Sequence, residues 1–191
     1  PKAVDEYLSS IEKYSSQKSN EQILNPVWHI HNGSPPKEKI VMPFSMLLNI
    51  VGSSNAKNKD ILWKFIKKFH KDIDPKNHKI LDELTSYAIN YFVDEVEPKK
   101  KYKKPNKDEK KALQNLISIL KKISQSTPAE EIQTMIYTAG KENGYSDNLR
   151  NWFKLIYEVT FGETNGPRMG FFISFFGIKE TIDLMEKKLK I

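Results

Sequence analysis

The sequence predicts an all-α protein, a bundle of about eight helices that a short extended segment precedes. Apolar residues recur three and four positions apart through most of the 191-residue chain, which is the spacing of one helix face. Helix start and stop signals, such as Thr127-Pro128 and Phe161-Gly162, separate these periodic stretches. No stretch shows a convincing sheet pattern. The chain is long enough to bury a core, so we expect helices packed on helices.

The N-terminal part contains one helical and one extended stretch. The segment 25–36 is bounded by prolines, and its polar and apolar residues alternate, so it is expected to be extended rather than helical. The preceding apolar residues share one helix face and predict a short amphipathic helix: Val4, Tyr7, Leu8 and Ile11.

Two histidines, His29 and His31, lie two positions apart in this extended segment. A zinc site needs further ligands at suitable spacing, and no third histidine, cysteine or carboxylate stands near them. We therefore expect both to be buried or hydrogen-bonded histidines rather than metal ligands.

The rest of the chain continues the helical pattern. Each stretch carries an apolar stripe, and turn residues such as Asp74-Pro75 and Pro98 separate the stretches. Ser146-Asp147 is expected to cap the helix that Phe161-Gly162 ends. The other helices are expected at 43–53, 60–71, 81–96, 108–123, 128–139, 167–176 and from 179 onward.

Composition restricts the partners. The net charge of +7 and the isoelectric point near 9.3 favour a polyanionic partner. The absence of cysteine excludes a disulfide framework and thiolate zinc sites, and it suits a reducing compartment. No apolar run approaches the roughly 20 residues that cross a bilayer, so no membrane partner is expected. Because the sequence starts at Pro1 without methionine, we expect a piece of a longer protein.

The stretch Asn165–Gly177 organises our interpretation of the chain. Gly166-Pro167 predicts a turn with proline at the first helical position. Arg168 would then lie in the first turn, beside free backbone N–H groups and an aromatic cluster that includes Phe172. Such a place suits a base or a phosphate. The alternative is a surface arginine above a phenylalanine core, and spacing alone leaves both open.

The segment Lys99–Pro105 carries the densest positive charge in the chain. With its interleaved tyrosine it predicts a loop that contacts a nucleic-acid backbone, and the alternative is a solvated, mobile linker. Arg150 and Arg168 are the two arginines among many lysines, so each is expected to need its planar fork. The predicted phosphate-contacting residues are Lys99, Lys100, Lys101, Tyr102, Lys103, Lys104 and Arg150.

No catalytic set emerges from the sequence. It lacks a glycine-rich nucleotide-binding loop, a nucleophile beside a base, and carboxylates at metal-site spacing. We therefore predict no catalytic residue, no metal and no cofactor in this chain. Two functions remain open, an RNA-binding module and a helical protein-interaction scaffold whose lysines keep it in solution.

An ordered series of short blocks resembles the C-terminal half of class I lysyl-tRNA synthetases. The series is more specific than any single block, and it runs nearly the whole length in the right order. The blocks are Asn25-Pro-Val-Trp-His-Ile-His-Asn-Gly33, Phe44-Ser-Met-Leu-Leu-Asn49, Tyr87-Ala-Ile-Asn-Tyr-Phe92, Pro98-Lys-Lys-Lys-Tyr102, Ile132-Gln133 and Gly166-Pro-Arg-Met-Gly170, with Gly177.

The resemblance implies an α-helix cage at 41–191 that binds the anticodon stem-loop of tRNA(Lys). Residues 1–40 would be the end of the stem-contact region and a linker. It also implies a cytoplasmic parent enzyme that attaches lysine to tRNA(Lys) with ATP and Mg in protein biosynthesis. The catalytic domain would lie upstream in the same chain, so this fragment alone is expected to be inactive.

The motif from Gly166 to Met169 looks like a loop that contacts an anticodon base in bacterial glutamyl-tRNA synthetases. Arg168 takes a place that often holds glycine in that loop. The resemblance implies that the anticodon contacts come from Gly166, Pro167, Arg168, Met169 and Phe172.

Overall fold

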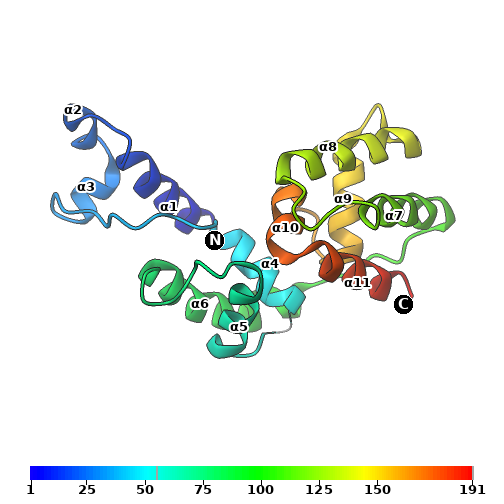
Figure 1. Cartoon of the computed structure of the whole chain (residues 1–191), viewed down its shortest axis with the longest axis horizontal. Helices are drawn as coiled ribbons and strands as arrows, with labels where there is room; N and C mark the ends of the chain where they lie inside the picture. Colours follow the sequence, from blue (N-terminus) through cyan, green and yellow to red (C-terminus); the bar gives the residue numbers. More distant parts are fainter. Residues whose placement is uncertain (55, 191) are drawn as a thin grey trace. The chain divides into compact units, whose positions relative to one another are not determined.

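A computed structural model describes residues 1–54 and 56–190. These residues form helices, turns and loops, and no strand occurs among them, so the predicted all-α class is confirmed. The chain forms two compact units, Pro1–Phe92 and Val93–Ile191 (Figure 1). The predicted division into 1–40 and 41–191 stays a prediction.

The first unit is built around α4 (Phe44–Ser54), which packs against α1, α5 and α6. Its apolar side chains are buried, Leu47 and Ile50 completely, as is typical of a central helix that is apolar on most sides. The other helices of this unit are α1 (Lys2–Tyr14), α2 (Ser19–Gln22), α3 (Pro26–Ile30), α5 (Lys59–Phe69) and α6 (Lys79–Tyr91).

The prediction of an extended segment at 25–36 is wrong for its first half, because α3 lies there. Asn25 caps the helix by accepting the Val27 N–H at 3.1 Å, and Pro26 takes the first helical position. After residue 33 the chain has no regular secondary structure as far as residue 41. His29 and His31 are hydrogen-bonded, as expected: His31 pairs with the Tyr7 hydroxyl at 2.8 Å, and His29 with a backbone carbonyl.

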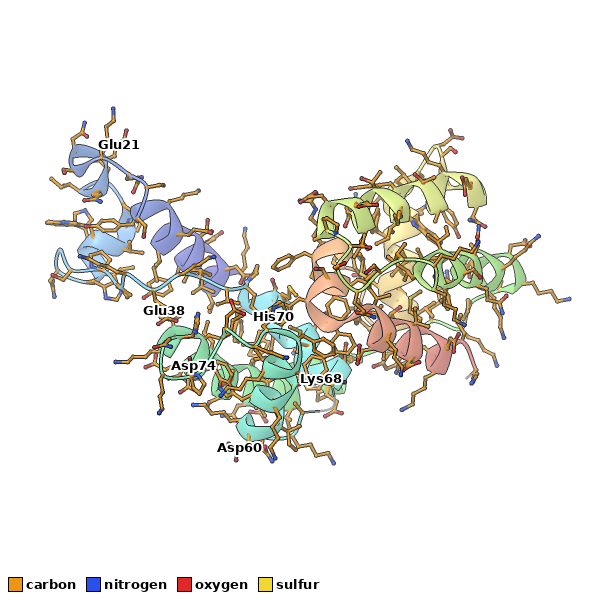
Figure 2. The ribbon with its side chains drawn as sticks, in the orientation of Figure 1. Glu21, Glu38, Asp60, Lys68, His70 and Asp74 are labelled. Carbon is orange, nitrogen blue, oxygen red and sulfur yellow. The ribbon has the colours of Figure 1, made fainter. Side chains whose placement is uncertain are left out.

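Carboxylates fix helix starts in the first unit (Figure 2). Glu38 accepts the Ile80 N–H at the beginning of α6, at 3.0 and 3.1 Å from its two oxygens. Asp74 accepts the N–H groups of Lys76 and Asn77 in the turn before α6, and these hydrogen bonds lower the pKa of Asp74. Such bonds satisfy backbone donors that a helix start or turn leaves unpaired.

In the second unit, the described residues 93–190 form a bundle of five α-helices with short π and 3-10 turns. Figure 1 shows these helices as α7 to α11. Trp152 is fully buried in this bundle, and the indole N–H donates to the Ile136 carbonyl at 2.9 Å. The elements from the unit boundary onward are η1 (Phe92–Val96), η2 (Glu97–Lys99), α7 (Lys107–Leu120), α8 (Ala129–Gly140), η3 (Lys141–Tyr145), α9 (Leu149–Thr160), α10 (Met169–Phe176) and α11 (Ile178–Leu189).

A close helix approach in the second unit joins α10 to the beginning of α8. A Cβ built on Gly170 would lie 2.2 Å from the Ala129 carbonyl oxygen and 2.7 Å from Gln133 Cβ. Only glycine therefore permits this approach. The Gly170 N–H donates to Gln133 Oε1 at 2.8 Å, and both groups are buried.

Helix starts differ from prediction at two places that bear on the site. The helix expected from Pro167 begins at Met169, because Arg168 has a non-helical ψ of 111° and acts as the N-cap. The helix expected from Pro128 begins at Ala129, with Pro128 as N-cap. At Pro167 a contact with a residue of α9, described below, keeps the turn from joining the helix.

Candidate nucleic-acid interface

The loop between α9 and α10 is held in place by Tyr157. Its hydroxyl donates to the Pro167 carbonyl at 2.8 Å, and its ring lies against Gly166, where a Cβ would come within 2.6 Å of the ring. Burial, with a smaller effect of Tyr137, raises the pKa of Tyr157 to about 12. The phenol is therefore neutral at pH 7 and remains a donor. This contact explains why Pro167 stays outside the helix.

Arg168 lies at the surface of this loop. Its side chain is 60% exposed, and its guanidinium pairs with the Glu130 carboxylate, which is 74% exposed, at the start of α8. An ion pair between two exposed groups contributes little to stability, about 0–1 kcal/mol. An anionic ligand can therefore replace Glu130 on Arg168 at small cost.

The other predicted contact residues lie at different depths. Gly166 is exposed and Pro167 is half-buried, whereas Met169 and Phe172 are fully buried. Phe172 stacks on Phe176 with ring centroids 5.0 Å apart and meets Phe161 edge to face. Met169 and Phe172 thus support the loop from below, and their direct contact with RNA stays a prediction.

The expectation of free N–H groups in the first turn of α10 is corrected at one position. The Gly170 N–H already donates to Gln133, a residue of one of the motif blocks. The first turn is therefore partly occupied by α8, and Arg168 is the cationic group that the loop exposes.

A row of aromatic side chains adjoins the loop, and the sequence interpretation missed it as a surface. Tyr137 of α8 is 41% exposed and meets Phe153 edge to face at 5.1 Å, and Phe153 lies 6.4 Å from Tyr157. Phe153 is half-buried. Phe153 and Tyr157 are four residues apart on one helix and therefore lie on the same face. This spacing could have predicted the aromatic row from the sequence.

The basic segment Lys99–Pro105 is fixed to the end of α9, which argues against a mobile linker. The Lys101 N–H donates to the Gly162 carbonyl at 2.9 Å, and the Lys103 N–H donates to the Glu158 carbonyl at 3.0 Å. The side chain of Lys100 pairs with Glu163 at 3.6 Å. The predicted phosphate-contacting segment and the predicted base-contacting loop therefore meet at the same end of α9.

The lysines of this segment differ in how far carboxylates neutralise them. Lys103 pairs with Glu109 at 2.6 Å, and this hydrogen bond raises the pKa of Lys103. Lys99 pairs with Glu95 at 2.5 Å, and Lys100 is only 7% exposed. Lys101 and Lys104 are exposed. These two are the best placed of the set for phosphates.

The last two predicted phosphate-contacting residues, Tyr102 and Arg150, lie at different distances from the loop. Tyr102 is 47% exposed in the basic segment, and Lys188 Nζ lies 3.3 Å from its ring centroid. Arg150 is exposed in the first turn of α9, whereas Glu158 lies in the last. Eight residues of helix separate them, about 12 Å along the axis. The structure thus places Arg150 at the opposite end of α9 from the loop.

The described part of the chain contains neither a metal-ligand cluster nor a membrane-spanning helix. Among residues 1–54 and 56–190, no three histidine, aspartate or glutamate side chains come together as metal ligands. No helix in the same residues is long and apolar enough to cross a bilayer.

The described residues form a basic, all-helical domain in which a loop with an exposed arginine, a row of aromatic side chains and a lysine-rich segment adjoin one helix, α9. Over 99% of its length the chain is similar to bacterial proteins named lysine–tRNA ligase, and the predicted kinship is confirmed. Identity is 40% over 189 residues with Roseobacter denitrificans, 41% over 191 with Rickettsia felis and 40% over 191 with Rickettsia bellii.

The chain spans 36% of the length of these curated relatives. It is therefore homologous to about a third of a lysine–tRNA ligase. It matches no protein-family model, and it shows no significant similarity to a solved structure.

Proposed function

We propose that this chain is the C-terminal, anticodon-binding part of a class I lysine–tRNA ligase. The similarity to proteins of that name over nearly the whole chain carries the proposal. In the whole enzyme, lysine would be activated with ATP and Mg and transferred to tRNA(Lys) in the cytoplasm. The catalytic part of the same chain would perform this reaction, and the part described by the structure would supply affinity and discrimination.

The geometry supports two different roles for the residues around the C-terminal part of α9. Arg168 offers a planar fork and a stacking face to an unpaired base, and Tyr137 with Phe153 offers aromatic surface nearby. Lys101 and Lys104 offer exposed charges to the backbone of the same strand. Contacts to bases make binding sequence-specific, whereas contacts to phosphates only position the nucleic acid. The Gly166–Arg168 loop would therefore recognise the base, and the basic segment would bind the backbone.

The experiment is direct binding of the 191-residue chain to a tRNA(Lys) transcript over a salt series. We expect log affinity to fall linearly with log salt. Changing Lys101 and Lys104 to glutamine should weaken all RNAs alike and reduce the slope by roughly 0.7–0.9 for each phosphate that is no longer bound. The matched control is Lys141→Gln with Lys179→Gln, two lysines outside both segments.

Absence of RNA binding by the folded chain would refute this proposal and favour the interaction scaffold. A second readout concerns catalysis, since the chain carries no nucleotide-binding loop. We expect no lysine-dependent exchange between ATP and pyrophosphate. Measurable exchange from a clean preparation would contradict the assignment to the non-catalytic part.

A further inference from the structure

A cleft of about 240 Å³ lies in the second unit beside the basic segment. Its apolar lining includes Val159 of α9 and Leu189 of α11, and Tyr102 contributes an aromatic edge. No aspartate or glutamate among the described residues lines it. Its cationic lining comes from the basic segment, from α7 and from the end of α11: Lys103, Lys104, Lys110, Lys188 and Lys190.

Among the described residues, carboxylates neutralise only part of the positive charge in this cleft. Lys103 is paired with Glu109, but Lys104 and Lys110 have no carboxylate within ion-pair distance among residues 1–54 and 56–190. Lys188 is drawn over the Tyr102 ring, and burial, with a smaller effect of Lys187, lowers the pKa of Lys188. Cations brought together and partly desolvated in this way favour an anion between them.

Lysines at the end of a helix also stabilise its negative terminus, and this explains part of the pattern. It accounts for Lys188 and Lys190, which lie at the end of α11. It does not account for Lys104 or Lys110, which reach the same cleft from the basic segment and from the first turn of α7. Lysines from three different elements meet in this cleft. An anion site requires such a convergence, whereas the stabilisation of a helix terminus does not.

The size of the cleft indicates what kind of anion it takes. Its volume is below the roughly 300–1,000 Å³ of pockets that enclose a whole small ligand. A second hollow of about 470 Å³ lies between α7 and α11 and shares Lys110, Leu189 and Lys190 with the first. Glu186, which pairs with Lys121 at 2.6 Å, also lines the second hollow. The two hollows adjoin at the three shared residues, and such a track of adjoining hollows suits one segment of a longer polyanion.

We propose that this lysine cleft holds a backbone phosphate and the attached sugar of a single-stranded segment of the bound RNA, as a second contact point beyond the Gly166–Arg168 loop. The inference rests on the proposed RNA-binding function and extends it. The phosphate lies among Lys104, Lys110 and Lys188, and the sugar packs on Val159 and Leu189. The site adds affinity without reading a base.

The test compares two charge-matched double variants of the 191-residue chain. Lys104→Gln with Lys110→Gln removes two cleft cations, and Lys107→Gln with Lys111→Gln removes two exposed cations from the same end of α7 that do not line the cleft. Circular dichroism verifies that both variants remain folded. Affinity for a tRNA(Lys) transcript is then measured at 50 and 200 mM salt.

For wild type, affinity should fall strongly over this fourfold rise in salt. If the cleft variant binds one phosphate fewer, its fall should be smaller by roughly threefold, and the fall of the control should equal that of wild type. Equal behaviour of the two variants, while Arg168→Ala still impairs binding, would overturn the cleft and leave the proposed function standing. No RNA binding by wild type would overturn the proposed function itself.

A second arm separates RNA from a free nucleotide. In 15N-labelled protein, a single-stranded RNA of about ten nucleotides should shift the amide signals of Lys104, Lys188 and Leu189 at lower concentration than adenosine monophosphate or inorganic phosphate. Equal or tighter binding of the mononucleotide would contradict the track and identify a small-molecule site.

Discussion

Gly170→Ala tests the contact on which the candidate site is built. The added methyl group would lie 2.2 Å from the Ala129 carbonyl oxygen, 2.7 Å from Gln133 Cβ and 2.7 Å from the Gln133 nitrogen. Favourable contacts between heavy atoms lie near 3.5 Å, so α10 must move away from α8 by about 1 Å. Two of the three obstructing atoms belong to backbone and cannot rotate away.

The magnitude follows from two opposing effects. Overpacking in a closely packed core costs about 1–3 kcal/mol, and a backbone obstruction lies at the upper end of that range. Alanine gains at most about 1 kcal/mol over glycine in a helix, and less in the first turn. The net loss should be about 2 kcal/mol. For a unit of this size that lowers Tm by about 8–16 °C.

The assay is thermal unfolding followed by circular dichroism, with Ser174→Ala as the control. Ser174 lies on the exposed side of α10, so its change should cost less than about 0.5 kcal/mol. Because the Gly170 N–H bond to Gln133 positions the loop, RNA affinity should fall with Tm only in the glycine variant. An unchanged Tm for Gly170→Ala would refute the α8–α10 geometry.

Two further changes test single contacts. Tyr157→Phe removes the hydroxyl bond to the Pro167 carbonyl and should cost about 0.5–1.5 kcal/mol. Because burial raises the pKa of Tyr157 from 10 to about 12, wild type should also lose stability as pH rises through that window, and the variant should lack this part of the loss. Burial acts to raise the pKa of Glu109, but its bond from Lys103 holds that pKa below 4.5. The free energy of unfolding of wild type should thus exceed that of Glu109→Gln by its largest amount above about pH 4.5, and this difference should disappear as pH falls further. A difference that does not depend on pH would argue against this ion pair.

Local pattern was sufficient to predict most helices. In α9, for example, Trp152, Ile156 and Val159 are spaced as one helix face, and all three are buried. Periodicity works there because one face of each helix meets the core. It failed at α3, because a proline-bounded stretch of alternating residues resembles a strand until the side-chain cap of Asn25 is known.

The candidate site depended on contacts between distant residues, which no local pattern reveals. The start of α10 is set by Tyr157, ten residues before Pro167, and the partner of Arg168 is Glu130, which lies 38 residues away. The sequence located the basic segment but could not tell that Lys100 pairs with Glu163 while Lys104 stays exposed. Those pairings follow from the packing of α9 against the segment.

We propose that the Gly166–Arg168 loop reads an anticodon base, and the affinities of Arg168 variants for two tRNAs can confirm or refute this role. Arg168→Ala should weaken binding of tRNA(Lys) by about 1–3 kcal/mol and affect a tRNA with another anticodon much less. Arg168→Lys should recover little, because an ammonium lacks the planar fork and stacking face. Glu130→Gln is the matched control: it removes the same ion pair but also the anionic competitor, so binding of tRNA(Lys) should stay equal or tighten. If Arg168→Ala and Glu130→Gln weaken both tRNAs alike, the arginine acts only through its ion pair, and the loop does not read the anticodon.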